Sequence, residues 1–302
     1  MTALITAFTN NILPILLAAG AGFVLGRKMD VPSAPIARMV LFLFTPCLIY
    51  TLITESQLPD SAILRMLVFT IVLMIIIAVL MGAVGMSFGW PKSIVAAAML
   101  GSLATNSGNY GLSLCQFAFG SEVLPYAALF LIGNSLMTYT LGIAIASWGS
   151  GKKGNPLTAP FKYPFLYAFI IGIVFSHLHI SLPLPVDRVV SLFSAAAIPS
   201  MLVLLGLQLS QSEWHRPSMA LTLTNVMRLV TSPLIAIGLA AVFALEGPAR
   251  QAGVLQAAMP TAVTATLLAA EFDLEPTFLT VTVALSTILS IFTLTPLIVY
   301  LS

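Results

Sequence analysis

Apolar stretches long enough to cross a lipid bilayer fill nearly the whole chain. A membrane-spanning helix needs about 20 apolar residues, so a helix with its turn takes roughly 30. The 302 residues therefore hold about ten spans and no sizeable soluble domain. Only 7% of the residues are charged, whereas a soluble domain has about 25%. Lipid must therefore surround most of the surface of this protein.

The expected fold is an all-α membrane protein of ten transmembrane helices. The chain lacks the alternating pattern of transmembrane β-strands. A net charge of +2 is too small to indicate nucleic-acid binding. The predicted spans are 8–26, 36–54, 62–88, 93–118, 122–148, 162–180, 187–210, 217–245, 249–270 and 276–301.

The two halves of the chain resemble each other. An offset of 153 residues aligns Pro46 with Pro199 and Ser107 with Pro260. Each half has five spans, an odd number, so the second half must insert upside down, as in many secondary transporters. The predicted organisation is a first repeat at 1–148, a cytoplasmic linker at 149–161 and a second, inverted repeat at 162–302.

The positions of the basic residues predict the orientation. With the N-terminus outside, eight basic residues lie in inner loops and three in outer loops, in agreement with the positive-inside rule. Both termini are then outside the cytoplasm, and the protein is a multi-pass protein of the cell membrane. The inner residues are Arg27, Lys28, Arg38, Lys92, Lys152, Lys153, Lys162 and Arg216, and the outer ones are Arg65, Arg188 and Arg250.

A polar cluster interrupts the fourth span. Asn106, Ser107, Gly108 and Asn109 follow one another near the middle of an apolar helix. Gly108 weakens the helix, while Asn and Ser side chains can bond to freed backbone groups. Such a break is tolerated in a membrane only beside protein or a watery cavity. The alternative is a helix-packing patch, because Gly and Ser are common at membrane helix contacts.

The corresponding span of the second half contains a proline. Pro260 removes a backbone donor and suits the first position of a new half-helix. Thr261 and Thr264 follow it, while Gln256 and Met259 precede it. A proline kink is also common in membrane helices, so Pro260 by itself does not establish a site. Its repeat relation to the cluster in the fourth span favours a second functional break.

Two broken helices that cross at mid-membrane predict an anion site. Each second half-helix begins there with free backbone N–H groups and a partial positive charge. Together the two N-termini can bind an anion without a cationic side chain. All ten acidic residues fall near span ends. This distribution argues against a proton relay, which usually relies on buried Asp or Glu.

Further polar residues lie deep in predicted helices. Arg228 of the eighth span could attract the anion or bond the carbonyls of the broken helices. Snorkelling toward the cytoplasmic surface is the alternative reading of Arg228. Interhelical hydrogen bonding and substrate contact explain three amide and hydroxyl side chains equally well: Asn134 and Ser135 of the fifth span and Asn225 of the eighth.

The chain resembles the auxin efflux carrier family, whose bacterial members include malonate transporters. The resemblance rests on NSGN at 106–109, on AAMPTA at 257–262 and on the stretch 228–233, and it covers essentially the whole chain. It implies a carrier in which spans 1, 2, 6 and 7 form a scaffold and a homodimer contact, while the other spans move. Plant members have a proline at both crossings, whereas this fourth span has Gly108. That departure favours a small carboxylate over auxin itself.

The first hypothesis is thus a secondary transporter of small organic anions that works by alternating access. A sodium-coupled symporter similar to the bile-acid family is the second hypothesis, because backbone carbonyls at the crossing could hold sodium. Proton coupling also stays open. A membrane-embedded enzyme needs a nucleophile, a base or a metal site, and no such constellation stands out. We therefore expect no cofactor, no metal and no enzymatic activity.

Overall fold

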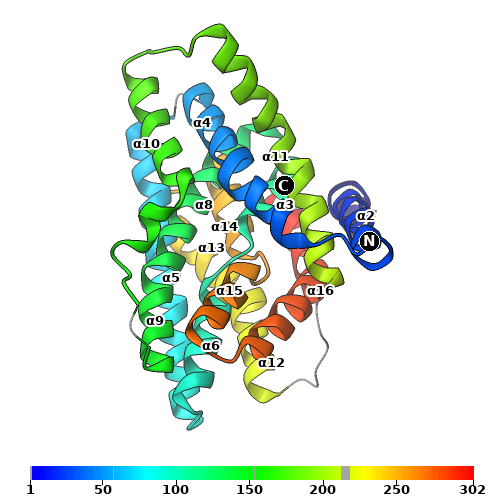
Figure 1. Cartoon of the computed structure of the whole chain (residues 1–302), viewed down its shortest axis with the longest axis vertical. Helices are drawn as coiled ribbons and strands as arrows, with labels where there is room; N and C mark the ends of the chain where they lie inside the picture. The colour runs from blue at the N-terminus through cyan, green and yellow to red at the C-terminus, as the bar shows by residue number, and fades with distance from the viewer. Residues whose placement is uncertain (1, 57, 153, 212–217) are drawn as a thin grey trace.

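The structure, a computed structural model, describes residues 2–56, 58–152, 154–211 and 218–302. Every regular element in these ranges is a helix (Figure 1). The predicted all-α fold is therefore confirmed. Lys153 and Arg216, which belong to the predicted cytoplasmic charges, lie outside the described residues.

Seven helical segments are long and apolar enough to cross a membrane, by length and composition, within the described ranges. Three of them contain a short π-helical turn (η1, η2 or η6), so each of these three continuous segments carries more than one helix label. The seven are Thr2–Lys28 (α1, η1 and α2), Ser33–Ser56 (α3, η2 and α4), Asp60–Ser87 (α5), Ser121–Ser150 (η4, α8 and α9), Leu184–Ser210 (α11), Met219–Val242 (α12, η6 and α13) and Pro276–Leu301 (α16).

Three apolar segments contain shorter helices. One is α10 (Pro164–His177), which follows a short 3-10 helix, η5 (Ala159–Lys162). The other two segments are broken in the middle, as the sequence predicts. The fourth segment consists of α6 (Lys92–Leu103), then η3 (Ser107–Leu112) and α7 (Ser113–Phe119), and the ninth consists of α14 (Gly247–Ala257) and α15 (Val263–Phe272).

The breaks differ in detail from the prediction. In the fourth segment the non-helical residues are 104–106, so Gly108 lies in the first turn of the second helix rather than in the break. In the ninth segment Pro260 lies within the non-helical stretch, and Val263 begins the new helix. The reason is that the backbone from Pro260 to Ala262 pairs with the other break, which delays the start of α15.

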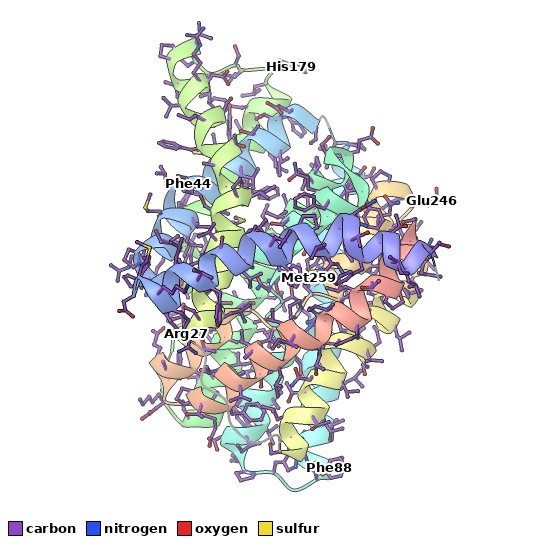
Figure 2. The ribbon with its side chains drawn as sticks, turned by 90° about the vertical axis from the view of Figure 1, so that its right-hand side faces the viewer. Arg27, Phe44, Phe88, His179, Glu246 and Met259 are labelled. Carbon is purple, nitrogen blue, oxygen red and sulfur yellow. The ribbon has the colours of Figure 1, made fainter. Side chains whose placement is uncertain are left out.

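The helices form two groups. Helices α2 and α11 pack along each other, as do α4 and α10, and α4 also contacts α11. The other group contains the two broken segments together with α5, α8, α9, α12, α13 and α16. Figure 2 shows Met259, which lies in the break of the ninth segment, near the centre of the molecule.

The closest helix contact within the first group depends on glycine. A Cβ atom on Gly206 of α11 would lie 1.8 Å from the carbonyl oxygen of Ala19, and one on Gly22 of α2 would lie 2.1 Å from that of Val203. No real atom can be accommodated at such distances from backbone. Small residues at membrane helix contacts let the two backbones approach closely in this way.

We expect Gly206→Ala to destabilise the protein because its methyl group must push α2 and α11 apart. Overpacking of this kind costs about 1–3 kcal/mol. The matched control is Gly238→Ala in α13, because nothing lies within 4 Å of a Cβ atom at that position. Thermal unfolding in detergent measures both variants, and equal melting temperatures would contradict the assigned contact.

Candidate functional site

The two broken segments cross and pair through their backbones. The amide of Asn106 donates to the carbonyl of Pro260 at 2.8 Å, and the amide of Ala262 donates to that of Ala104 at 2.9 Å. These bonds form an antiparallel β-bridge between residues 105 and 261. Backbone groups inside a bilayer must find protein partners, because lipid offers none. Each break therefore satisfies part of the backbone that the other break exposes.

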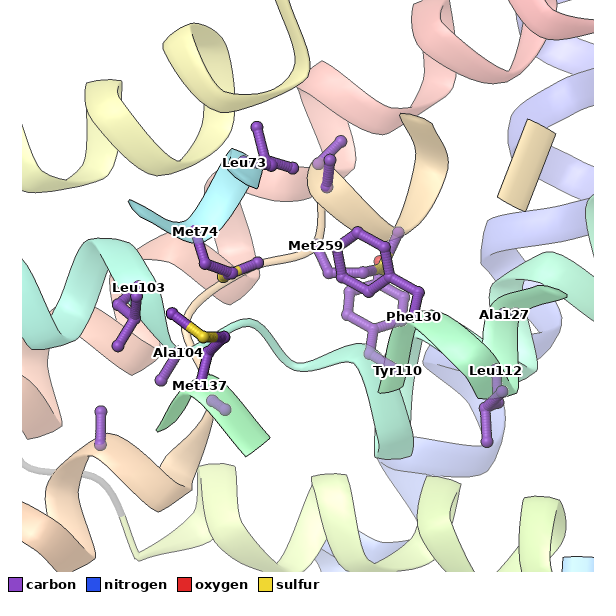
Figure 3. Close-up of a cluster of buried hydrophobic side chains, with 14 of the residues drawn as sticks. Leu73, Met74, Leu103, Ala104, Tyr110, Leu112, Ala127, Phe130, Met137 and Met259 are labelled. Atoms are coloured by element: carbon purple, nitrogen blue, oxygen red, sulfur yellow. The ribbon is translucent and has the colours of Figure 1, made fainter. Parts of the chain in front are cut away.

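The crossing is buried among apolar side chains. Figure 3 shows the break in the fourth segment, which follows Leu103 and begins at Ala104, among the side chains of Met74, Met137 and Met259. Met74 and Met259 have no exposed surface, and Met137 is 8% exposed. The unbranched thioether side chain of methionine fills irregular gaps of this kind well.

Arg228 binds the ends of both first half-helices. Its guanidinium donates to the carbonyl of Ser102, in the last turn of α6, at 2.7 Å, and to the carbonyl of Ala257, the last residue of α14. It also donates to the hydroxyl of Ser232 at 2.7 Å. Because a helix C-terminus carries partial negative charge, one cation stabilises both ends.

This geometry bears on the predicted roles of Arg228. The side chain has no exposed surface, so it does not snorkel toward the membrane surface. The alternative in which it bonds the carbonyls of the broken helices agrees with its contacts.

Other predicted site residues also hold the crossing together. The hydroxyl of Thr261 donates to the carbonyl of Gly101 at 2.7 Å. The amide nitrogen of Gln256 donates to the carbonyl of Ser107 at 3.1 Å. Asn134 accepts from the amide of Thr105 at 3.2 Å and donates to its carbonyl at 3.0 Å, as a neighbouring strand would. These side chains replace backbone partners that the breaks remove.

A cavity of about 200 Å³ lies beside the crossing, between the two groups of helices. One wall comes from the crossing, α8 and α15, and the other from η2, α4, α11 and the start of α10. None of its described lining residues is charged. The polar lining residues are Thr45, Thr105, Asn106, Asn109, Asn134, Ser135, Thr138, Tyr139, Tyr163, Gln208 and Thr264.

Both second half-helices begin at this cavity. Gly108 and Asn109, in the first turn of η3, line it, and so do Val263 and Thr264, the first two residues of α15. The first N–H groups of a helix have no intrahelical acceptor, and their partial positive charge favours an anion. The C-termini of the first half-helices point instead at Arg228. The crossing thus places the two helix N-termini, with their partial positive charge, at the cavity. It places the two helix C-termini, with their partial negative charge, at Arg228.

The structure divides the residues predicted for the site into two sets. Those that line the cavity are Asn106, Gly108, Asn109, Asn134 and Thr264. Those that lie outside the lining, at the crossing or behind it, are Ser107, Arg228, Gln256, Met259, Pro260 and Thr261.

Sequence reasoning identified the lining residue Ser135 beside Asn134, but it missed several other polar lining residues, including Thr45, Thr105 and Thr138. Thr138 shares a face of α8 with Asn134, four residues earlier. That spacing is a usable signal. It is weak, however, because a threonine in a helix usually bonds to its own backbone.

Comparison with known proteins agrees with a transport function. The family model described as "Membrane transport protein" matches residues 157–298. An "Uncharacterized transporter" of Methanothermobacter thermautotrophicus is 29% identical over 95% of this chain and 96% of its own length. A "Putative malonate transporter" of Rhizobium meliloti is 22% identical over 96% and 94%, respectively. "Auxin efflux carrier component 6" of Arabidopsis thaliana is 25% identical over 62% of this chain and 32% of its own length.

The chain is similar to membrane transport proteins. The predicted resemblance to the auxin efflux carrier family is therefore confirmed. The names of these relatives describe transporters and not enzymes. Together with the apolar helices, they support a multi-pass protein of the membrane.

We expect Arg228→Met to destabilise the protein strongly, because it removes the donor to the carbonyl of Ser102. A hydrogen bond to a charged group contributes about 1.5–3 kcal/mol. Arg228→Lys restores part of this loss, because it keeps the charge but not the planar fork that reaches two carbonyls. Unfolding in detergent by heat measures the series.

The matched control for Arg228 is Arg250→Met. Arg250 also donates a hydrogen bond, to the hydroxyl of Tyr300 at 2.8 Å, but this contact is exposed. Its loss costs about 0.5 kcal/mol or less, as is usual for surface substitutions. Similar melting temperatures for Arg228→Met and Arg250→Met would contradict the role assigned to Arg228.

Proposed function

We propose that this protein is a secondary transporter that carries a small organic anion, a carboxylate such as malonate or an auxin-like acid, by alternating access. The observation that carries the proposal is the cavity at which two helix N-termini meet between two groups of helices. Helix N-termini favour anions. A site between two groups can be opened to one side and then to the other by movement of one group against the other.

An inverted repeat of ten spans is the architecture that this proposal requires. The seven long and three shorter apolar segments agree in number, and the breaks fall in the fourth and ninth segments. The helix contacts also follow the pattern expected for two repeats related by a two-fold axis, in which each contact between the halves occurs twice with the roles of the halves interchanged. The first segment packs on the seventh through α2 and α11, and the second packs on the sixth through α4 and α10. We propose the two repeats and their linker at the bounds that the sequence predicts.

The moving group would contain the crossing, and the scaffold would contain α2, α4, α10 and α11. The close approach of α2 and α11 at Gly206 supports this division, because so tight a contact resists sliding. A homodimer through the scaffold stays a prediction.

The sodium-coupled alternative finds less support at the crossing. Sodium would need backbone carbonyls there as ligands. The carbonyls of Gly101, Ser102, Ala104, Pro260 and Ala257 each accept a hydrogen bond from another group of the protein. We therefore favour an anion site without sodium at the crossing, and we leave sodium or proton coupling to the uptake experiment.

Uptake into proteoliposomes tests the function directly. The substrates are radiolabelled malonate, indole-3-acetate and a panel of other mono- and dicarboxylates, with and without sodium and pH gradients. We expect wild-type protein to carry at least one of these anions. Failure to carry or bind any of them, by protein that unfolds cooperatively, would refute the proposal.

In the same assay we expect Asn109→Ala to lose affinity for the anion without loss of stability. Asn109 is a partly exposed residue of the cavity wall, in the first turn of η3. The loss of one hydrogen bond to a charged group corresponds to a roughly 10- to 150-fold weaker affinity. Asn10→Ala, an exposed position in η1, is the control. Equal uptake by both variants would remove Asn109 from the site.

The orientation of the chain is also testable. In Figure 2, Arg27 and Phe88, which the charge bias assigns to the cytoplasmic side, lie below Met259, while His179 and Glu246 lie above it. We expect a cysteine at Lys152, in a variant without Cys47 and Cys115, to resist an impermeant maleimide applied to intact cells. A cysteine at Arg188 should react. The opposite pattern would invert the proposed topology.

A further inference from the structure

One face of α8 forms a wall of the cavity. Leu131, Asn134, Ser135 and Thr138 follow one another at the spacing of a single helix face, and all four line the cavity. Asn134 bonds the backbone of Thr105 at the crossing. Thr138, one turn further along α8, is 2% exposed and therefore contacts the cavity from a nearly buried position.

The hydroxyl of Thr138 differs from those of other helical threonines in this protein. Thr70, Thr140, Thr224 and Thr287 each donate to the carbonyl four residues earlier, at 2.7–2.8 Å. Thr138 Oγ1 is buried and has no hydrogen-bond partner among the described residues. The usual intrahelical bond of threonine is thus not made at a residue that lines the cavity.

A buried hydroxyl without a partner is costly to the folded state. Valine has nearly the same shape and would fill this position without that cost. A second hydroxyl shares these properties: Thr105 Oγ1, at the crossing, also lines the cavity, is buried and has no partner in the described part of the chain. Two residues with unpaired hydroxyl groups thus line one cavity, at which helix N-termini favour an anion.

We propose that the Thr138 hydroxyl donates a hydrogen bond to a carboxylate oxygen of the transported anion. Thr105 completes the site from the side of the crossing. This assignment rests on the proposed function and deepens it, because it places the carboxylate between the crossing and α8. The rest of the substrate then extends along the apolar lining residues, such as Met201 and Leu204 of α11.

The test compares Thr138→Val with Thr140→Val in purified protein. Thr140 lies two residues further along and donates to the carbonyl of Leu136 at 2.7 Å, but it does not line the cavity. For the best-carried anion of the carboxylate panel, we expect Thr138→Val to raise the Kd about 10- to 150-fold, as for loss of a bond to a charged group. Thr140→Val should leave the Kd within about threefold, since the hydrogen bond that it removes lies within the helix and not at the cavity.

Two further measurements separate a ligand contact from a structural role. Thr138→Ser retains the hydroxyl and should restore most of the affinity. The uncharged amide analogue of the same anion should lose little affinity in Thr138→Val, because the bond to an ionised acceptor is the strong one. The melting temperature of Thr138→Val without ligand should equal or exceed that of wild type.

The outcomes distinguish the proposed role of Thr138 from the proposed transport function. If wild type carries a carboxylate and Thr138→Val binds it as tightly as Thr140→Val does, the transporter stands and the role of Thr138 is refuted. If Thr138→Val and Thr138→Ser lose affinity equally, the side chain acts by shape and the hydrogen bond is refuted. If wild type carries no carboxylate, the proposed function and this inference fail together.

Discussion

The antiparallel pairing of the two breaks is the interaction on which the rest of the site depends. A helix can be interrupted in a membrane only if the freed N–H and C=O groups find partners in the protein. Here the amides of Asn106 and Ala262 bond across to the carbonyls of Pro260 and Ala104. Thr261 then satisfies the carbonyl of Gly101. With these bonds in place, two helix ends can be exposed to a cavity without unpaired backbone in lipid.

The crossing also separates the partial charges of the helix ends. Four helix ends meet at the centre of the molecule, two negative and two positive. Arg228, a buried cation, binds the two negative ends at the carbonyls of Ser102 and Ala257. The positive ends, near Asn109 and Thr264, are left to the cavity. A cation that binds backbone on one side thereby leaves the other side able to attract an anion, although no charged side chain lines the cavity among the described residues.

How much of this could be predicted follows from the range of the interactions involved. The break in the fourth segment was predictable from the cluster around Ser107 and Gly108, because polar residues in an apolar span are a local signal. The break was predicted at 106–109 and lies at 104–106, because pairing with the ninth segment decides where each half-helix resumes. The cavity residue Thr138 was missed because a threonine in a helix ordinarily satisfies itself, and only its surroundings show that it does not.

The sequence by itself determined that this chain is helical, that it lies in lipid and that two of its spans are interrupted, because length, hydropathy and local helix propensity act along the chain. Only the tertiary structure decided which polar groups serve the fold and which face the cavity. Ser107 and Asn109 are two residues apart, yet the carbonyl of Ser107 is bonded to Gln256 while Asn109 lines the cavity. That division depends on the partner that each group meets from a distant segment. Hydrogen bonds between distant segments produce no periodic pattern of residues from which they could be predicted.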